Sequence, residues 1–129
     1  IAIAVDPNRT FGYVLKGDRT LPEEQQTVFK LKVLSARELA KLEDSVSVMD
    51  KDGNWQVKVG TKVLEILRLG LKGWENFLRT SASTIPFKDA SDESLDLLRP
   101  EWRIELADAI TEQTSLSEGE VKNLESGRD

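Results

Sequence analysis

The chain has 129 residues with a formal net charge of −5, and it contains neither His nor Cys. This length predicts one domain with its own hydrophobic core, and the absence of Cys excludes disulfides and thiolate metal ligation. Because no apolar run approaches the roughly 20 residues of a membrane-spanning helix, we expect a cytoplasmic protein without membrane contact.

The charges are distributed unevenly along the chain. Residues 1–88 contain 14 Lys and Arg against 11 Asp and Glu, a net of +3, whereas residues 89–129 contain 4 against 12, a net of −8. Such an asymmetry constrains association rather than fold. It allows one end of the molecule to attract the other end of a second copy, or a basic partner.

The first 27 residues predict a partly irregular amino-terminal arm, with a short apolar run at 11–15 between two turn sequences. Residues 28–33 alternate between apolar and basic side chains, which predicts a half-buried strand. Ser35 and Glu38 have the spacing of a capping box, which satisfies free N–H groups at the start of a helix. Apolar residues at 39, 42 and 46 continue that helix on one face.

Residues 50–54 predict a turn, and residues 46–49 and 55–59 predict the two strands of a hairpin around it. A calcium loop is not expected, since Gly53 stands at position 4 of the segment and an EF-hand needs Gly at position 6. Trp residues lie more often in the core than at a contact. Trp55, on the second strand beside turn residues, is nevertheless the best candidate for an exposed partner anchor.

The clearest helical pattern covers residues 61–78, where an apolar stripe faces away from the charged residues. Gly70 and Gly73 interrupt this pattern, and each costs about 1 kcal/mol relative to Ala inside a helix. Either the close approach of another element or a break near Leu71 would explain them, and we favour close approach. Residues 80–94 then predict a loop, and residues 94–98 predict a short helix.

Pro100 suits the first position of a helix, and the pattern predicts one that ends at about residue 111. This helix directs Trp102 and Leu106 inward and presents an acidic stripe on its opposite side, formed by Glu101, Glu105, Asp108 and Glu112. A second capping-box spacing at Ser117 predicts a last helix to about residue 125, before a frayed tail at 126–129. The whole pattern predicts the α+β class, as a mainly α-helical single domain over residues 1–129 with a small antiparallel β element.

The motifs of nucleophilic catalysis and of phosphate binding are missing from this sequence, whereas the number of carboxylates alone does not exclude a glycosidase pair. No serine has a His base or a Ser-x-x-Lys partner, and the glycine motifs that bind phosphate are absent. The acidic stripe lacks the His residues that accompany di-metal sites in helix bundles. We therefore expect no enzyme activity, no cofactor and no metal. Nucleic-acid binding is not expected either, because the basic excess is small and the chain is acidic as a whole.

The acidic stripe is expected to be either solvated surface or the negative half of a protein contact. Candidates for the positive half are Lys58, Lys62, Arg68 and Lys72. Contacts between two different surfaces are heterologous and generate rings or spirals, and exposed charge contacts weaken with salt. Reversing the charge of Glu105 and Asp108 is then expected to weaken assembly and leave folding intact.

Several segments together resemble one protein family. They are residues 6–11 (DPNRTF) with 13–15 (YVL), 33–38 (VLSARE) with 42–44 (LED), 69–77 (LGLKGWENF) with 85–87 (IPF), and 98–102 (LRPEW) with 105–107 (ELA). The set resembles the tail assembly chaperones of long-tailed bacteriophages, and it spans nearly the whole chain.

The resemblance implies a non-enzymatic protein of the host cytoplasm that self-associates as a ring or spiral. Such a protein coats the long helical tape measure protein, helps to recruit the tail tube protein, and leaves the finished tail. The alternative is a structural component of the virion, such as a head–tail connector or tail terminator protein.

Overall fold

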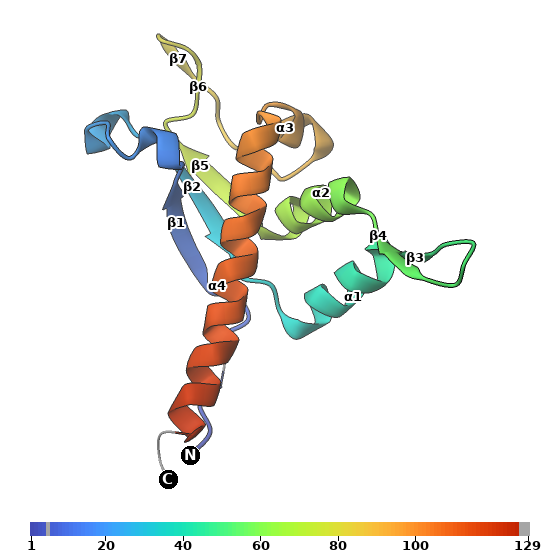
Figure 1. The fold of residues 1–129 in the computed structure, drawn as a ribbon. Coiled ribbons are helices and arrows are strands. Elements are labelled where there is room, and N and C mark those ends of the chain that lie inside the picture. Colours follow the sequence, from blue (N-terminus) through green and yellow to red (C-terminus); the bar gives the residue numbers. More distant parts are fainter. Residues whose placement is uncertain (5, 127–129) are drawn as a thin grey trace.

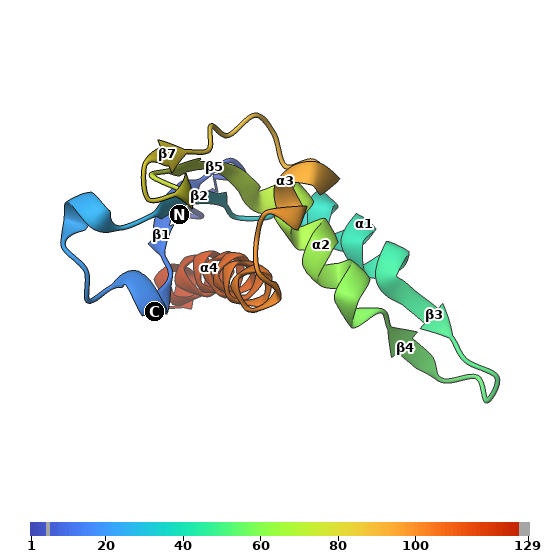
Figure 2. The same cartoon turned by 90° about the horizontal axis from the view of Figure 1, so that it is seen from above.

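A three-stranded antiparallel sheet crossed by one long helix forms the centre of the fold. The computed structural model describes residues 1–4 and 6–126. The sheet has the order β1-β2-β5, with β1 at Thr10–Val14, β2 at Val28–Lys32 and β5 at Leu71–Glu75. Phe29 and Leu31 of β2 are fully buried and Lys30 is exposed, so the predicted half-buried strand is confirmed. Helix α4, Pro100–Ser126, lies across one face of this sheet (Figures 1 and 2).

The amino-terminal segment supplies an edge of the sheet. The predicted arm, residues 1–27, contains β1 and two 3₁₀ turns, at Lys16–Asp18 and Glu23–Gln25. β1 pairs antiparallel with β2, with Phe11 opposite Leu31 and Tyr13 opposite Phe29. Val5 lies outside the described residues.

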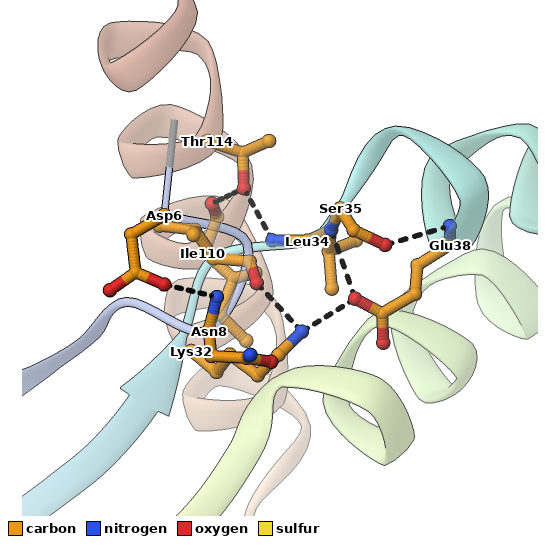
Figure 3. Close-up of polar contacts among 9 residues, drawn as sticks. Asp6, Asn8, Lys32, Leu34, Ser35, Glu38, Ile110 and Thr114 are labelled. Atoms are coloured by element: carbon orange, nitrogen blue, oxygen red, sulfur yellow. Dashed lines mark hydrogen bonds and ion pairs between the residues drawn. The ribbon is translucent and has the colours of Figure 1, made fainter. Parts of the chain in front are cut away.

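Helix α1, Ala36–Val46, begins at the predicted capping box. The Ser35 Oγ accepts the Glu38 backbone N–H at 3.2 Å, and a Glu38 carboxylate oxygen accepts the Ser35 N–H at 2.9 Å. The same carboxylate forms an ion pair with Lys32, whose ammonium also donates to the Val33 carbonyl (Figure 3). The capping box therefore also neutralises a buried lysine at the end of β2.

The junction between β2 and α1 is bonded to α4 as well. The Thr114 hydroxyl of α4 accepts the Leu34 N–H at 3.0 Å and donates to the Ile110 carbonyl at 2.7 Å (Figure 3). The Thr114 side chain thus satisfies the buried backbone N–H of Leu34, a residue just beyond the end of β2.

The predicted hairpin is confirmed. Strand β3, Ser47–Met49, pairs with β4, Trp55–Val57, and Met49 stands opposite Trp55. The hairpin connects α1 to α2 and projects from the body of the molecule (Figures 1 and 2).

The predicted helix at 61–78 is wrong beyond residue 70. Helix α2 spans Val59–Gly70, and the chain continues directly into β5. The register between β2 and β5 shifts at Lys30/Leu31, so Lys72 is an extra residue on β5. Such a bulge places Leu71 and Trp74, three residues apart, on the same buried side. This spacing imitates one turn of a helix.

Both explanations offered for Gly70 hold. The helix ends there, and a Cβ on Gly70 would stand 2.6 Å from Ile110 Cδ1 and 3.1 Å from the Lys32 carbonyl oxygen. Gly73 instead lies on β5, where a Cβ would be in ordinary contact with Lys30.

The predicted loop at 80–94 holds the end of one strand, all of a second and the start of a helix. β6, Leu78–Thr80, pairs with β7, Ser83–Thr84, and the Trp74 indole N–H donates to the Ile85 carbonyl at 2.7 Å. The short helix α3 covers Asp92–Asp96, two residues before the predicted start, because Ser91 caps it.

Helix α4 begins at Pro100 as predicted, but its expected end near residue 111 is wrong. It continues without interruption to Ser126, so the helix predicted from Ser117 is its last part. The Thr111 and Thr114 hydroxyls donate to the carbonyls of Ala107 and Ile110, four residues earlier, so both polar side chains have a partner within the helix. Of the predicted frayed tail, residues 127–129 lie outside the described residues.

The α+β class is confirmed, but the expectation of a mainly α-helical domain with one small β element is wrong. The described residues form four α-helices and three small antiparallel sheets, with 44% of residues helical. The buried hydrophobic residues of the central sheet and of α4 belong to one cluster, so the sheet is part of the core and not a minor addition to a helical domain.

Candidate protein-binding surfaces

The acidic stripe of α4 is divided between two environments. Glu105 faces β1, where its Oε2 accepts the Tyr13 hydroxyl at 2.8 Å and the Lys16 backbone N–H at 2.9 Å. Glu101, Asp108 and Glu112 are exposed. Glu105 therefore joins α4 to the amino-terminal segment, while the other three carboxylates remain open to a partner.

A polar cleft of about 550 Å³ lies between β1 and α4. Tyr13, Lys16 and Arg19 line one side, and Glu105, Asp108 and Glu112 line the other. Burial raises the pKa of Tyr13 to about 12, assisted by the hydrogen bond to the Glu105 carboxylate and by its charge. Since the cations of the cleft stand among its carboxylates, the cleft offers little net charge to a ligand.

The four basic candidates do not form one surface. Lys58 immediately precedes α2, and Lys62 lies within α2, one helical turn after Lys58. Lys72 lies on the bulge of β5. Arg68 is engaged within the molecule, in ion pairs with Glu65 on α2 and, at 2.7 Å, with Asp92 on α3. Lys58 and Lys62 are therefore the pair that is adjacent to the hairpin.

Trp55 is exposed, as predicted, and it belongs to a larger apolar face. Met49 and Trp55 are directly opposed, and Val57 lies two residues beyond Trp55 on the same side of the hairpin. Their exposed fractions are 57%, 67% and 51%. We call these three residues the hairpin face. Trp74 and Trp102, in contrast, pack into the aromatic cluster around Phe77.

The turn of the hairpin is well ordered by hydrogen bonds. The Asp50 carboxylate accepts the N–H groups of Asp52 and Asn54, both at 2.9 Å, and the Gln56 amide at 3.0 Å. The hydrogen bond from Asn54, together with that from Gln56, lowers the pKa of Asp50. Gly53 has a φ of +82°, which a residue with a side chain rarely adopts. The hairpin face is thus held on a defined scaffold.

A second apolar surface begins where the hairpin ends. A groove of about 610 Å³ runs between the start of α2 and the start of α4, with Arg103 and Asp108 at its polar positions. Its apolar lining, which we call the α2–α4 groove, consists of Val59, Val63, Leu64, Pro100 and Ile104. Val59 is 69% exposed and Ile104 is 52% exposed. Because Val59 follows Val57 by two residues, the hairpin face and the groove are adjacent.

Sequence reasoning identified Trp55 but missed the groove. Ile104 carried a signal, since it lies off the inward stripe of α4 and one helical turn from Asp108, on the side expected to be acidic. Val59 continued the apolar alternation of Val57 into the next helix. The groove itself depends on how α2 packs beside α4, which no local pattern reports.

No group of three or more acidic residues in the described part of the chain is arranged to hold a metal ion. Among the helices of the described residues, none combines the length and apolar character needed to cross a bilayer. Lys32, which belongs to the mildly basic part of the chain, is buried and paired with Glu38. Comparison with protein-family models, with curated proteins and with solved structures finds no match for this chain.

Proposed function

We propose that this protein is a tail assembly chaperone of a long-tailed bacteriophage, which self-associates and binds the tape measure protein in the host cytoplasm. It acts by reversible contact with other polypeptides and forms or breaks no covalent bond. The sequence resemblance motivates the family, and the adjacent hairpin face and α2–α4 groove support the mode of action.

The observation that carries the proposal is the open apolar surface. Two large apolar side chains, Met49 and Trp55, stand more than half exposed on a projecting hairpin. Large contiguous apolar patches are rare on monomeric proteins and mark interaction sites. Trp is also the residue type most enriched among the energetically dominant residues of interfaces.

Coexpression with the tape measure protein of the same phage tests the proposal. A chaperone should keep the tape measure protein in solution and copurify with it. A Trp55→Ser variant should lower this yield, whereas Val48→Ser, on the opposite side of the same hairpin, should not. A tape measure protein that aggregates equally with and without the chain contradicts the proposal.

Analysis of purified virions distinguishes the proposed chaperone from the alternative, a structural component of the virion. A chaperone should be missing from the particle, because it leaves before the tail is complete. A head–tail connector or tail terminator protein should instead be present in the particle at the stoichiometry of a ring.

A further inference from the structure

We infer that the hairpin face of one copy docks into the α2–α4 groove of the next copy, so that one repeated contact builds the oligomer. The inference rests on the self-association proposed above and names the two surfaces that carry it. Four features of the described structure support this contact: the shape of the donor, the lining of the acceptor, their charges, and the direction of the hairpin tip away from α4.

The donor is a preorganised projection. The hairpin leaves the body of the molecule between α1 and α2, and in Figure 2 it points away from α4. Its turn is fixed by the Asp50 carboxylate and by the positive φ of Gly53. A preordered element loses little conformational freedom on binding. Because its tip points away from α4, the tip cannot fill the groove of its own chain.

The acceptor presents apolar side chains at helical spacing from two sides. Val59 and Val63 lie one turn apart on α2, and Pro100 and Ile104 lie one turn apart on α4. The groove volume of about 610 Å³ falls within the range of about 300–1,000 Å³ that is typical of ligand sites. A Trp side chain buries about 150–250 Å² when covered, so Trp55 is suited to be the central residue of this contact.

Each of the two surfaces carries one cation and one anion, which allows each charge to be matched with an opposite one. The tip of the hairpin carries Lys51 and Asp52 side by side, and the groove carries Asp108 and Arg103. None of these four residues forms an ion pair within the described part of the chain. With Trp55 in the groove, we place Asp52 against Arg103 and Lys51 against Asp108. Opposite charges at the edge of an apolar contact fix its orientation.

A contact between two different surfaces leaves a free donor on one end and a free acceptor on the other. Such heterologous contacts propagate, as rings when the rotation closes and as spirals when it does not. Pairing of two identical hairpin faces would instead stop at a dimer and leave Val59 and Ile104 exposed. The hairpin-to-groove contact covers both apolar surfaces of every internal copy.

Mixing two assembly-deficient variants tests the inference. Trp55→Lys removes the donor and Ile104→Lys removes the acceptor, both at exposed positions. By sedimentation velocity, each variant alone should be monomeric at concentrations where the wild type forms oligomers. Their equimolar mixture should form one heterodimer and nothing larger, because it has one intact donor and one intact acceptor. A mixture that stays monomeric overturns the inference, as does either variant with wild-type assembly.

Two control variants show whether a new lysine alone disturbs assembly, and a second pair of variants tests the same contact through its charges. Val48→Lys on the other side of the hairpin and Leu116→Lys further along α4 should assemble like the wild type. If an apolar-to-Lys variant does not fold, variants of the surface charges still test the contact. Asp52→Arg and Arg103→Asp should each weaken association about two- to fivefold, as expected for an exposed ion pair. The double variant should recover wild-type affinity, and additive losses would overturn the inference.

Retention of the tape measure protein is scored in the same preparations, so that the two ideas fail separately. If the mixed variants dimerise while no form of the chain retains the tape measure protein, the contact stands and the proposed function fails. If the wild type retains it while Trp55→Lys still forms wild-type oligomers, the inferred contact fails and the proposed function stands.

Discussion

The hydroxyl of Tyr13 on β1 donates to the Glu105 carboxylate on α4 across 2.8 Å, and the Lys16 N–H donates to the same oxygen. Glu105 therefore has a structural role that its three neighbours in the acidic stripe lack. Charge reversal at Glu105 would perturb the fold as well as any contact. A clean test of the stripe in assembly reverses Glu101 and Glu112, which are exposed and do not line the α2–α4 groove.

Replacing Glu105 should destabilise the protein measurably. Glu105→Ala leaves two donors without their acceptor, and the free energy of unfolding should fall by about 2 kcal/mol. Asp108→Ala, one turn away and exposed, should stay within about 0.5 kcal/mol of the wild type. Urea unfolding followed by circular dichroism measures both. Equal effects at the two positions would contradict the assigned role of Glu105.

Tyr13 should make the stability depend on pH in the alkaline range. Its pKa rises from 10.0 to about 12 in the folded protein, so the folded state holds the proton more tightly than the unfolded state. This contribution is complete below pH 10 and is lost as the pH rises through about 12. Tyr13 is the single Tyr of the chain, so tyrosinate absorbance titrates it alone. Tyr13→Phe should remove this component, and an unfolded-like titration would contradict the prediction.

The pair of Lys32 and Glu38 should show strong coupling. Lys32 is buried, and the pKa of Glu38 is lowered because the hydrogen bonds from Lys32 and Ser35 outweigh the opposing effect of burial. Glu38→Gln keeps a residue suited to the capping box but leaves a buried ammonium without its counter-charge. The free energy of unfolding should fall by about 3 kcal/mol.

Removing both charges tests this explanation. Lys32→Met combined with Glu38→Gln should recover most of the lost stability, because no buried charge then remains. In the wild type, the contribution of Glu38 is present above its unfolded pKa of 4.5 and is lost as the pH falls through its lowered folded pKa. Additive losses in the double variant would show that the two residues act independently.

Gly70→Ala should be destabilising although Ala is the better helix former. The new Cβ would stand 2.6 Å from Ile110 Cδ1, and overpacking of this kind costs about 1–3 kcal/mol. Gly60→Ala on the same helix is the matched control. No atom lies within 4 Å of its Cβ position, so it should gain up to about 1 kcal/mol. Thermal unfolding of the two variants should shift in opposite directions.

The salt dependence of assembly should distinguish the two kinds of contact considered for this chain. An interface between the acidic stripe and surface lysines would weaken steeply as salt screens it. A contact centred on Trp55 and the α2–α4 groove is mainly apolar and should change little. Sedimentation at low and high salt measures this, and a steep loss of oligomers would favour the acidic stripe.

A helix, strand or turn could be predicted from the sequence where residues within that same element carry the signal. The capping box of Ser35 and Glu38 defines the start of α1, the alternation around Phe29 defines β2, and the turn at Gly53 defines the hairpin. Exposure of Trp55 followed from its neighbours in the same hairpin. These signals depend on residues a few positions apart.

The sequence predictions that were wrong or incomplete concern contacts between segments that are far apart in the chain. The spacing of Leu71 and Trp74 imitates a helix because a bulge against β2 places both in the core. The α2–α4 groove exists because α2 packs beside a helix that begins about 40 residues later. Glu105 likewise left the predicted surface because β1 brings Tyr13 to it.

The amino-acid sequence by itself therefore determined the α+β class, the hairpin, the exposed Trp55 and the absence of His and Cys chemistry. Only the tertiary structure decided which residue ends α2, which carboxylate of α4 is free, and where an apolar groove opens. The physical reason is that capping, alternation and turn geometry are local properties of the chain. Bulges, interhelical grooves and hydrogen bonds between segments depend on which parts of the chain become neighbours after folding.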